Sequence, residues 1–431
     1  MKRKATILSG LLVGSLLLTA CGGGGSAGGD SANAQRGPIK IWYANFEPEI
    51  KWAQQMIEAW NAEHPDQKIT GQEVPAGKSS EEAVTAAIAA GNTPCLIFNG
   101  AQIATPDYQH MGGLVSLDSF PGAAEYIESR SGEKVAQQYK SPDGKYYQIP
   151  WKANPLMMFY NKDIFAKAGL DPDNPPLSTY QDFLSAARKV VAKGGAKYAI
   201  APAPTNEFYQ SFFDFYPLSV AESGGTLLVK DGKAQFNSDA GLQVANFWRT
   251  IYQEGLAPKD PVSTTTDPFA EGKVAIRSAG PWAISTYGKL HWGVVPVPTP
   301  NGMPANQTWT FADAKTISIY SSCKNRGTAW DVLKFATGEE QDGKFLEMTG
   351  EMPLRQGLPD KYPDYFAKNP SYMTFADQAS RVAEVPFVPN SIGIWQTFRD
   401  AYVASVVFGK QDVTSAFDQA AQKVEQLAGE K

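Results

Sequence analysis

The sequence offers little material for metal binding or for catalysis by histidine and cysteine. Only three histidines and three cysteines occur among 431 residues. His64, His110 and His291 stand apart from one another, so we expect no metal cluster. No phosphate-binding loop of the Walker type is present, and ATP hydrolysis would therefore belong to a partner. The sequence accordingly predicts no catalytic residue, no metal ion and no cofactor.

Charge is also scarce, and basic charge is the scarcer kind. Charged residues make up 19% of the chain, with 39 basic against 44 acidic residues. A nucleic-acid-binding protein needs a basic face that releases counterions, so the net charge of −5 argues against that class. The hydrophobic fraction of 43% excludes a disordered chain and predicts sizeable cores. A chain of this length is expected to form two domains.

Long apolar runs are lacking except at the N-terminus. There the run 7–18 follows three basic residues at positions 2–4, and it is too short to span a bilayer. It ends in Leu-Thr-Ala-Cys, with the cysteine at position 21, which resembles the lipobox of bacterial lipoproteins. Cleavage before Cys21 would leave that thiol to carry a diacylglycerol.

The alternative is an ordinary secretory signal that is cut near Ala20 and followed by an incidental cysteine. We expect 1–20 to be a signal peptide and 21–37 to be a lipidated tether, because the latter segment consists mostly of Gly, Ser and Ala.

The mature chain alternates short apolar runs with helical periodicity, which is typical of an α/β protein. A capping box at Ser178-x-x-Gln181 and an aspartate at position 412 each predict the start of a helix. The predicted strands cover 38–43, 68–74, 95–98, 273–277, 292–297 and 315–320. The predicted helices cover 49–63, 81–90, 238–254 and segments that begin at Ser178 and Asp412.

Several segments resemble a known family in the family's order. They are DGKYYQIPW at 143–151, FYNKDIFAKAGL at 159–170, FAEGKVAIRSAGPW at 269–282, KNRGTAWDVLKF at 324–335 and GEMPLR at 350–355. The chain resembles the extracellular solute-binding proteins of ABC importers, specifically the carbohydrate-binding group related to maltose-binding protein.

This resemblance implies an α/β, two-lobed periplasmic-binding-protein-like fold of type II, with a ligand cleft between the lobes. Asn154-Pro155 and the proline-rich stretch 296–304 suit extended crossings between lobes. By analogy, lobe one would comprise 38–151 and 302–338, and lobe two would comprise 152–301 and 339–431.

The resemblance also implies a function. The protein would be a monomeric, non-enzymatic receptor that captures an oligosaccharide by lobe closure and delivers it to ABC transporter permease subunits. It would be held at the outer face of the cell membrane only by the lipid on Cys21. Two alternatives stay open: an importer receptor for glycerophosphodiesters, with Lys152 and Arg355 as phosphate ligands, and a secreted glycoside hydrolase. The hydrolase needs two carboxylates, but no acidic pair lies in a catalytic motif.

Sugars present hydroxyls around the ring edge and apolar C–H faces, so their sites combine aromatic side chains with Asn, Asp, Glu or Arg. Positions that follow predicted strands provide Asn45, Glu47, Asn99 and Gln102, for which helix capping is the alternative at the first three. The resemblance adds Trp151, Lys152, Glu207, Tyr209, Trp282, Trp309, Asp313, Arg355 and Trp395.

Within this set Trp282 is the first choice, because the family presents an aromatic ring to the sugar at the turn after Gly-Pro. Core packing is the alternative for Trp151 and Trp395. Trp309 and Asp313 lie where the family often has glycines, so their assignment departs from the family pattern.

The family fold bears on the two remaining cysteines as well. It places Cys95 at the start of one strand and Cys323 at the end of a neighbouring antiparallel strand. The compartment outside the membrane is oxidising, so the resemblance implies a Cys95–Cys323 disulfide. Two free thiols are the alternative.

Overall fold

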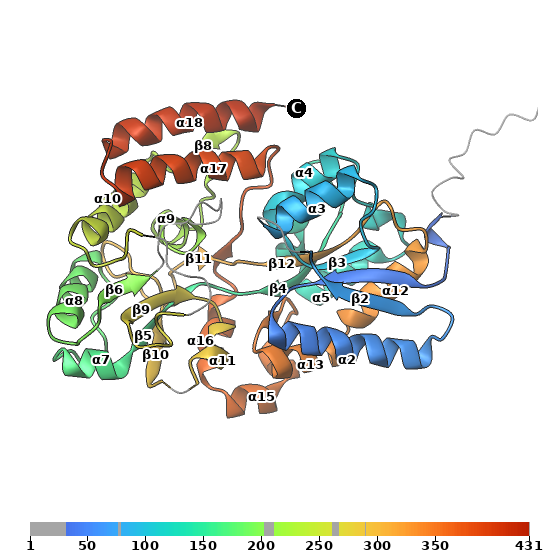
Figure 1. The fold of residues 1–431 in the computed structure, drawn as a ribbon, viewed down its shortest axis with the longest axis horizontal. Helices are drawn as coiled ribbons and strands as arrows, with labels where there is room; N and C mark the ends of the chain where they lie inside the picture. Colours follow the sequence, from blue (N-terminus) through green and yellow to red (C-terminus); the bar gives the residue numbers. More distant parts are fainter. Residues whose placement is uncertain (1–31, 76–78, 202–210, 261–266, 289, 431) are drawn as a thin grey trace, which may run out of the picture.

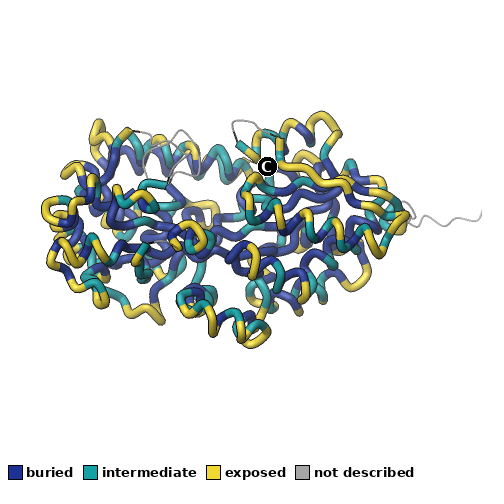
Figure 2. Tube along the Cα trace, turned by 60° about the horizontal axis from the view of Figure 1, so that its bottom comes forward, coloured by how far each residue is buried: buried dark blue, intermediate teal, exposed yellow. Residues whose placement is uncertain are grey.

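The computed structural model describes residues 32–75, 79–201, 211–260, 267–288 and 290–430. It has two lobes side by side, each built on a β-sheet with helices against it (Figure 1). Buried residues run through the middle of both lobes, and exposed residues follow the outer helices and loops (Figure 2). Within the described ranges, no helix combines the length and apolarity needed to cross a bilayer.

The first lobe contains a six-stranded sheet in which β1, β2 and β3 are parallel, while β12 runs antiparallel to β3 and β4. Its strands, in spatial order, are β13 (Met352–Pro353), β4 (Ile149–Ala153), β12 (Lys315–Ile319), β3 (Leu96–Ala101), β1 (Ile39–Tyr43) and β2 (Ile69–Glu73). Its helices are α2 (Glu47–Glu63), α3 (Ser80–Ala89), α4 (Thr105–His110), α5 (Ala123–Ser131), α6 (Glu133–Ala136), α12 (Arg326–Ala336) and α13 (Glu339–Thr349), with short 3₁₀ turns at Gln102–Ala104, Leu117–Ser119 and Gln137–Tyr139.

The second lobe contains a four-stranded sheet. Its strands, in spatial order, are β10 (Trp292–Val295), β5 (Met157–Asn161), β9 (Val274–Ala279) and β6 (Tyr198–Ala201). Its helices are α7 (Lys162–Lys167), α8 (Tyr180–Ala192), α9 (Phe215–Glu222), α10 (Asp239–Gln253), α11 (Ala283–Thr286), α17 (Ser391–Tyr402) and α18 (Val413–Gly429), with a hairpin of β7 (Val229–Lys230) and β8 (Lys233–Ala234) and a π-helical turn at Val403–Val407. Three further helices, α14 (Leu358–Lys361), α15 (Pro363–Lys368) and α16 (Ser371–Gln378), precede the last crossing between lobes.

Within the described residues, the chain crosses between the lobes three times: from β4 to β5, from β10 to β12, and from β13 to α17 by way of α14 to α16 and β14 (Val382–Ala383). The last two crossings pair in parallel as β11 (Thr310–Phe311) and β14. Short paired segments of this kind are suited to act as a hinge between near-rigid lobes.

One stretch lies differently from the expected division. Strand β13 pairs with β4 of the first sheet, and Phe345 of α13 belongs to the first lobe's core. The segment 339–353, which was expected in the second lobe, therefore joins the first lobe's sheet and core through β13 and Phe345, while Leu346 and Met352 pack in the cluster that contains Phe159 of β5. We propose that lobe one extends through this segment.

Most predicted elements form with small shifts at their ends. Asp412 caps α18 through the backbone N–H of Ser415, as predicted. The cap of α8 lies one residue later than predicted. The side chain of Thr179, rather than that of Ser178, accepts a hydrogen bond from the backbone N–H of Asp182. Ser178 and Thr179 are both good caps, so the sequence leaves this register open.

The predicted disulfide is present. Cys95 and Cys323 are joined at an S–S distance of 2.06 Å, next to the antiparallel pair β3 and β12. The bond ties the start of β3 to the loop that follows β12, within the first lobe.

Candidate functional site

A cavity of about 880 Å³ opens between the lobes. The first lobe lines it at the carboxyl ends of β1, β2 and β3, which meet at one edge of the sheet because these strands are parallel. The first lobe provides Asn45, Gln72, Glu73, Val74, Pro75, Ser79, Ser80, Glu81, Ala101, Ile103, Asp313 and Lys315, and the second lobe provides Phe212 and Phe213.

Two residues beside the cavity hold a left-handed backbone that only glycine adopts without strain. Asn99 has φ 63° and Asp313 has φ 41°. Asn99 is in β3 and Asp313 lies two residues before β12, the strand whose Lys315 pairs with Ala101 of β3. Such a backbone costs on the order of 1–3 kcal/mol and is concentrated at functional sites. The strain therefore marks this edge of the first sheet as a candidate binding surface.

The charges of the cavity wall are mostly negative. Lys315 Nζ lies 2.5 Å from Asp313 Oδ1, so this cation is already paired. Glu73 and Glu81 also line the wall. Among the described lining residues, Lys315 is the single cation. The wall is thus richer in hydrogen-bond acceptors than in positive charge.

A buried carboxyl group lies behind this wall, at the hinge. Glu384 follows β14 and is 5% exposed, and the Tyr139 hydroxyl donates to its Oε1 at 3.1 Å. From the second lobe, the Tyr216 hydroxyl donates to the Glu384 backbone carbonyl at 2.6 Å. Burial raises the pKa of Glu384 to about 8, an effect that Tyr139 opposes and Asp313 increases. Glu384 is therefore mostly protonated at neutral pH and connects both lobes without a buried charge.

Four of the predicted ligand residues gather at the cavity. Asn45 and Asp313 line it directly. Asn99 and Gln102 flank the lining residue Ala101, and each has a buried side-chain oxygen without a partner among the described residues. Buried polar atoms are normally satisfied, so these two unpaired oxygens are unusual, but both are enclosed and a ligand would reach them only after a local rearrangement.

Two residues at the first crossing, Trp151 and Lys152, were predicted to bind the ligand, and the structure contradicts this assignment. Trp151 is 1% exposed and packs among Trp52, Phe98 and Phe345 in the first lobe's core. Lys152 is equally buried and is held by carboxylates of the same lobe. Strand β4 is central in the sheet and buried along its whole length, so neither side chain reaches the cavity.

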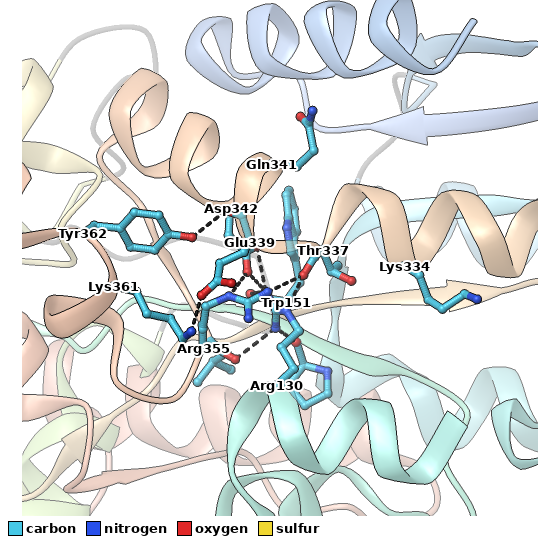
Figure 3. Close-up of polar contacts among 12 residues, drawn as sticks. Arg130, Trp151, Lys334, Thr337, Glu339, Gln341, Asp342, Arg355, Lys361 and Tyr362 are labelled. Carbon is cyan, nitrogen blue, oxygen red and sulfur yellow. Dashed lines mark hydrogen bonds and ion pairs between the residues drawn. The ribbon is translucent and has the colours of Figure 1, made fainter. Parts of the chain in front are cut away.

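Arg355 is also not free for a ligand. Its Nε donates to Asp342 at 2.7 Å, and Arg130 donates to the other oxygen of the same carboxylate at 2.9 Å (Figure 3). Both guanidinium groups also bond the Thr337 carbonyl. The Arg355 guanidinium, which was expected to bind a ligand through two of its nitrogens, instead donates to Asp342 and to the Thr337 carbonyl. It thereby joins the segment after β13 to the first lobe.

The other three tryptophans that were predicted as ligands lie in three different environments. Trp395 is fully buried against Phe212 in the second lobe's core, so its ligand assignment is wrong. Trp309 lines a separate, much smaller cavity beside the hinge. Trp282 is half-buried at the start of α11 and lies edge-on to the lining residue Phe213, with ring centroids 6.5 Å apart.

Three other predictions are placed as follows. Glu47 begins α2 and pairs with Lys51 at 3.2 Å, so it has the helix-end role that was its alternative. Glu207 and Tyr209 lie outside the described residues, as does Cys21.

Several lining residues were missed. Gln72 and Glu73 lie at the carboxyl end of β2, and Glu81 lies in α3. Glu73 fell inside the predicted strand 68–74, so the rule that places candidates after strands did not select it. Phe213 belongs to a dense aromatic run, and nothing in that run separates lining rings from core rings such as Phe215.

Comparison with known proteins agrees with this architecture. A family model described as bacterial extracellular solute-binding protein matches residues 43–343. The diacetylchitobiose-binding protein DasA of Streptomyces coelicolor is 25% identical over 378 residues, covering 83% of each chain. The sn-glycerol-3-phosphate-binding periplasmic protein UgpB of Escherichia coli is 26% identical over 413 residues, covering 90% of this chain and 92% of the relative.

A solved structure has the same fold. The GacH receptor of Streptomyces glaucescens, solved unliganded and with acarbose, superposes with a TM-score of 0.76 at 21% identity, covering 91% of this chain and 98% of its own.

Proposed function

The chain belongs to the family of bacterial extracellular solute-binding proteins, and from this premise we propose that it captures an oligosaccharide between its lobes and presents it to the permease of an ABC importer. It binds its ligand without converting it. The bound sugar contacts both lobes and therefore stabilises the closed conformation, which is the state that the permease recognises.

The cavity between the lobes carries this proposal. Its volume of about 880 Å³ falls within the roughly 300–1,000 Å³ of typical ligand sites. One wall has amide, hydroxyl and carboxylate groups for sugar hydroxyls, and the other has Phe212 and Phe213 for apolar ring faces. A ligand that touches both walls stabilises the closed arrangement, whereas a ligand that touches one wall would shift nothing.

A thermal-shift screen of the mature protein over a glycan panel tests the function, with calorimetry on each positive glycan. Stabilisation follows RT ln(1 + [L]/Kd), so a ligand at about 100 times Kd adds roughly 2.7 kcal/mol. Conversion of the glycan during the titration would contradict a pure binding role. A panel without any stabilising glycan would contradict the sugar ligand.

A phosphate-bearing ligand is the second candidate, because UgpB is named for sn-glycerol-3-phosphate. The charges of the residues that the structure describes do not favour it. Lys152 and Arg355 are committed to buried carboxylates, and Lys315 is paired with Asp313. Phosphate recognition calls for free cationic donors. Including sn-glycerol-3-phosphate in the panel separates the two candidates directly.

We predict that Trp282→Ala weakens binding of the best glycan by roughly 2–4 kcal/mol, as loss of an aromatic hot spot does. The ring lies beside Phe213, where closure would bring a sugar face against it. Trp282→Phe keeps an aromatic face and should retain most of the affinity. Calorimetry measures both variants, with melting of the unliganded proteins as the control. An unchanged affinity would remove Trp282 from the site, and a large loss of unliganded stability would assign it to the core.

We also propose that Cys21 carries the lipid that holds the protein at the membrane. The first described residues pack on the first lobe, where Arg36 pairs with Asp331 and the backbone N–H of Gly37 donates to Thr328. The tether would then leave from this lobe, and the second lobe would move relative to it.

Cys21→Ser should release the mature protein into the medium, because a diacylglycerol provides the two acyl chains that stable anchoring requires. Fractionation of cells and medium measures the effect, with Ser26→Ala in the tether as a matched control. Membrane retention of the Cys21 variant would contradict the anchor.

A further inference from the structure

A second cavity, of about 630 Å³, lies on the first lobe outside the inter-lobe site. It follows the face of the first sheet that is opposite α2. Trp42 and Lys40 of β1 and Thr70 and Gln72 of β2 line it, and it ends near the disulfide at Cys95. We call this cavity the strand groove.

The strand groove adjoins the inter-lobe cavity at Gln72, which lines both. In the parallel pair, Lys40 lies opposite Thr70 and Trp42 lies opposite Gln72, so these four side chains share one face. The groove runs from the carboxyl ends of the strands, at the cleft, to their amino ends. Five residues of strand at ~3.3 Å each give it a length of roughly 16 Å.

The lining has the mixed chemistry that suits a carbohydrate. Trp42 is half-buried and provides one flat apolar surface, while Lys40, Thr70 and Gln72 are exposed and polar. A protein-docking surface would be expected to have a more apolar centre. An indole surrounded by hydrogen-bonding side chains matches a sugar ring with its apolar face and polar edge.

We propose that the strand groove binds additional sugar units of a linear oligosaccharide whose first units occupy the cleft. The protein would then prefer oligosaccharides longer than the cleft alone accommodates. This inference rests on the proposed function, since it needs a saccharide in the cleft. It adds a binding surface on one lobe that raises the affinity for longer oligosaccharides, whereas binding in the cleft drives lobe closure.

Calorimetric titration of the mature protein with two linear series tests the proposal. The series are N-acetylchitooligosaccharides and maltooligosaccharides, each from the disaccharide to the hexasaccharide. Affinity for the wild type should rise roughly tenfold from the shortest bound member to the longest, as expected for one added aromatic contact.

Thr70→Arg is the principal variant, because Thr70 is exposed on the edge strand β2 and a long side chain there fills the groove without removing core contacts. It should abolish the gain with length and leave the affinity for the shortest bound member unchanged. Gln54→Arg is the matched control, since Gln54 is exposed on α2 over the opposite face of the sheet. It should behave as the wild type. Trp42→Ala should reproduce the effect of Thr70→Arg, with melting curves as its folding control.

The outcomes separate this inference from the function on which it rests. Binding without dependence on length, or equal affinities of the wild type and Thr70→Arg for long members, would overturn the groove and leave the cleft intact. No binding of either series would overturn both ideas for these sugars.

Discussion

Lys152→Ala should lower the free energy of unfolding by about 3–5 kcal/mol, the cost of leaving buried charges without their partner. Lys152 Nζ donates to Glu49 Oε1 at 2.8 Å and to Glu351 Oε1 at 2.7 Å, and all three side chains are at most 5% exposed. The three groups join α2, β4 and the start of β13. Removing the cation leaves two carboxyl groups facing each other in a low dielectric. The destabilisation is therefore expected to be large although no ligand contact is lost.

The pH dependence identifies the cause of this destabilisation. Burial and the neighbouring Glu49 raise the pKa of Glu351 to about 8, against the pull of Lys152. The folded state thus binds more protons than the unfolded state between about pH 4.5 and 8. The stabilisation that comes from protonated Glu351 is fully present below about pH 4.5 and is lost as the pH rises through 8. Without Lys152 the Glu351 carboxyl loses the cation that lowers its pKa, so the cost of Lys152→Ala should be larger at pH 8 than at pH 5.

Denaturant unfolding at both pH values measures this effect. Lys152→Met, which retains most of the side-chain volume, should show a similar loss, so the charge rather than a cavity is responsible. The triple variant Glu49→Gln, Lys152→Met, Glu351→Gln should recover much of the stability, because no buried charge remains. A loss below about 1 kcal/mol that does not change with pH would show that the ion pairs contribute little.

Replacing both Cys95 and Cys323 with alanine should lower stability by several kcal/mol. The bond joins positions 228 apart in sequence, and the chain-entropy model gives on the order of 5 kcal/mol for such a loop. The second lobe lies within the loop and folds on its own sheet, which shortens the effective loop in a partly unfolded chain. The measured value should therefore fall below this figure, with the loss concentrated in the first lobe.

Denaturant unfolding with and without a reductant provides the internal control. Reduced wild type should unfold at the same denaturant concentration as the double alanine variant, and oxidised wild type at a higher one. Coincidence of all three curves would mean that the disulfide does not stabilise the first lobe.

The elements of this fold follow closely from local sequence patterns. Strands such as Ile39–Tyr43 and Lys315–Ile319 were predicted from short apolar runs, and α18 from its Asp412 cap and the apolar spacing that follows it. These signals are local, because side-chain periodicity and capping hydrogen bonds involve residues a few positions apart. The ordered family motifs then predicted the arrangement of these elements in two lobes, and also the Cys95–Cys323 pairing.

The candidate site was predictable only in part. The rule that ligands lie at the carboxyl ends of parallel strands led to Asn45, which lines the cavity, and to Asn99 and Gln102, which lie close to its lining residue Ala101; their role as ligands stays a prediction. The rule could not tell which Trp, Lys or Arg reaches the cavity. Trp151, Lys152, Arg355 and Trp395 have the chemistry of sugar ligands, yet all four are used inside the lobes.

Local patterns in the sequence were enough to predict the α/β alternation and many of the strands and helices, with shifts at their ends, and the family resemblance predicted the two lobes. The edge of the sheet at which a ligand would bind stays a prediction. Only the tertiary structure decided whether each polar or aromatic side chain meets a partner or the cleft. The energy of a buried charge or ring depends on neighbours far away in sequence, such as Glu49 and Glu351 for Lys152, which are supplied when distant segments pack together.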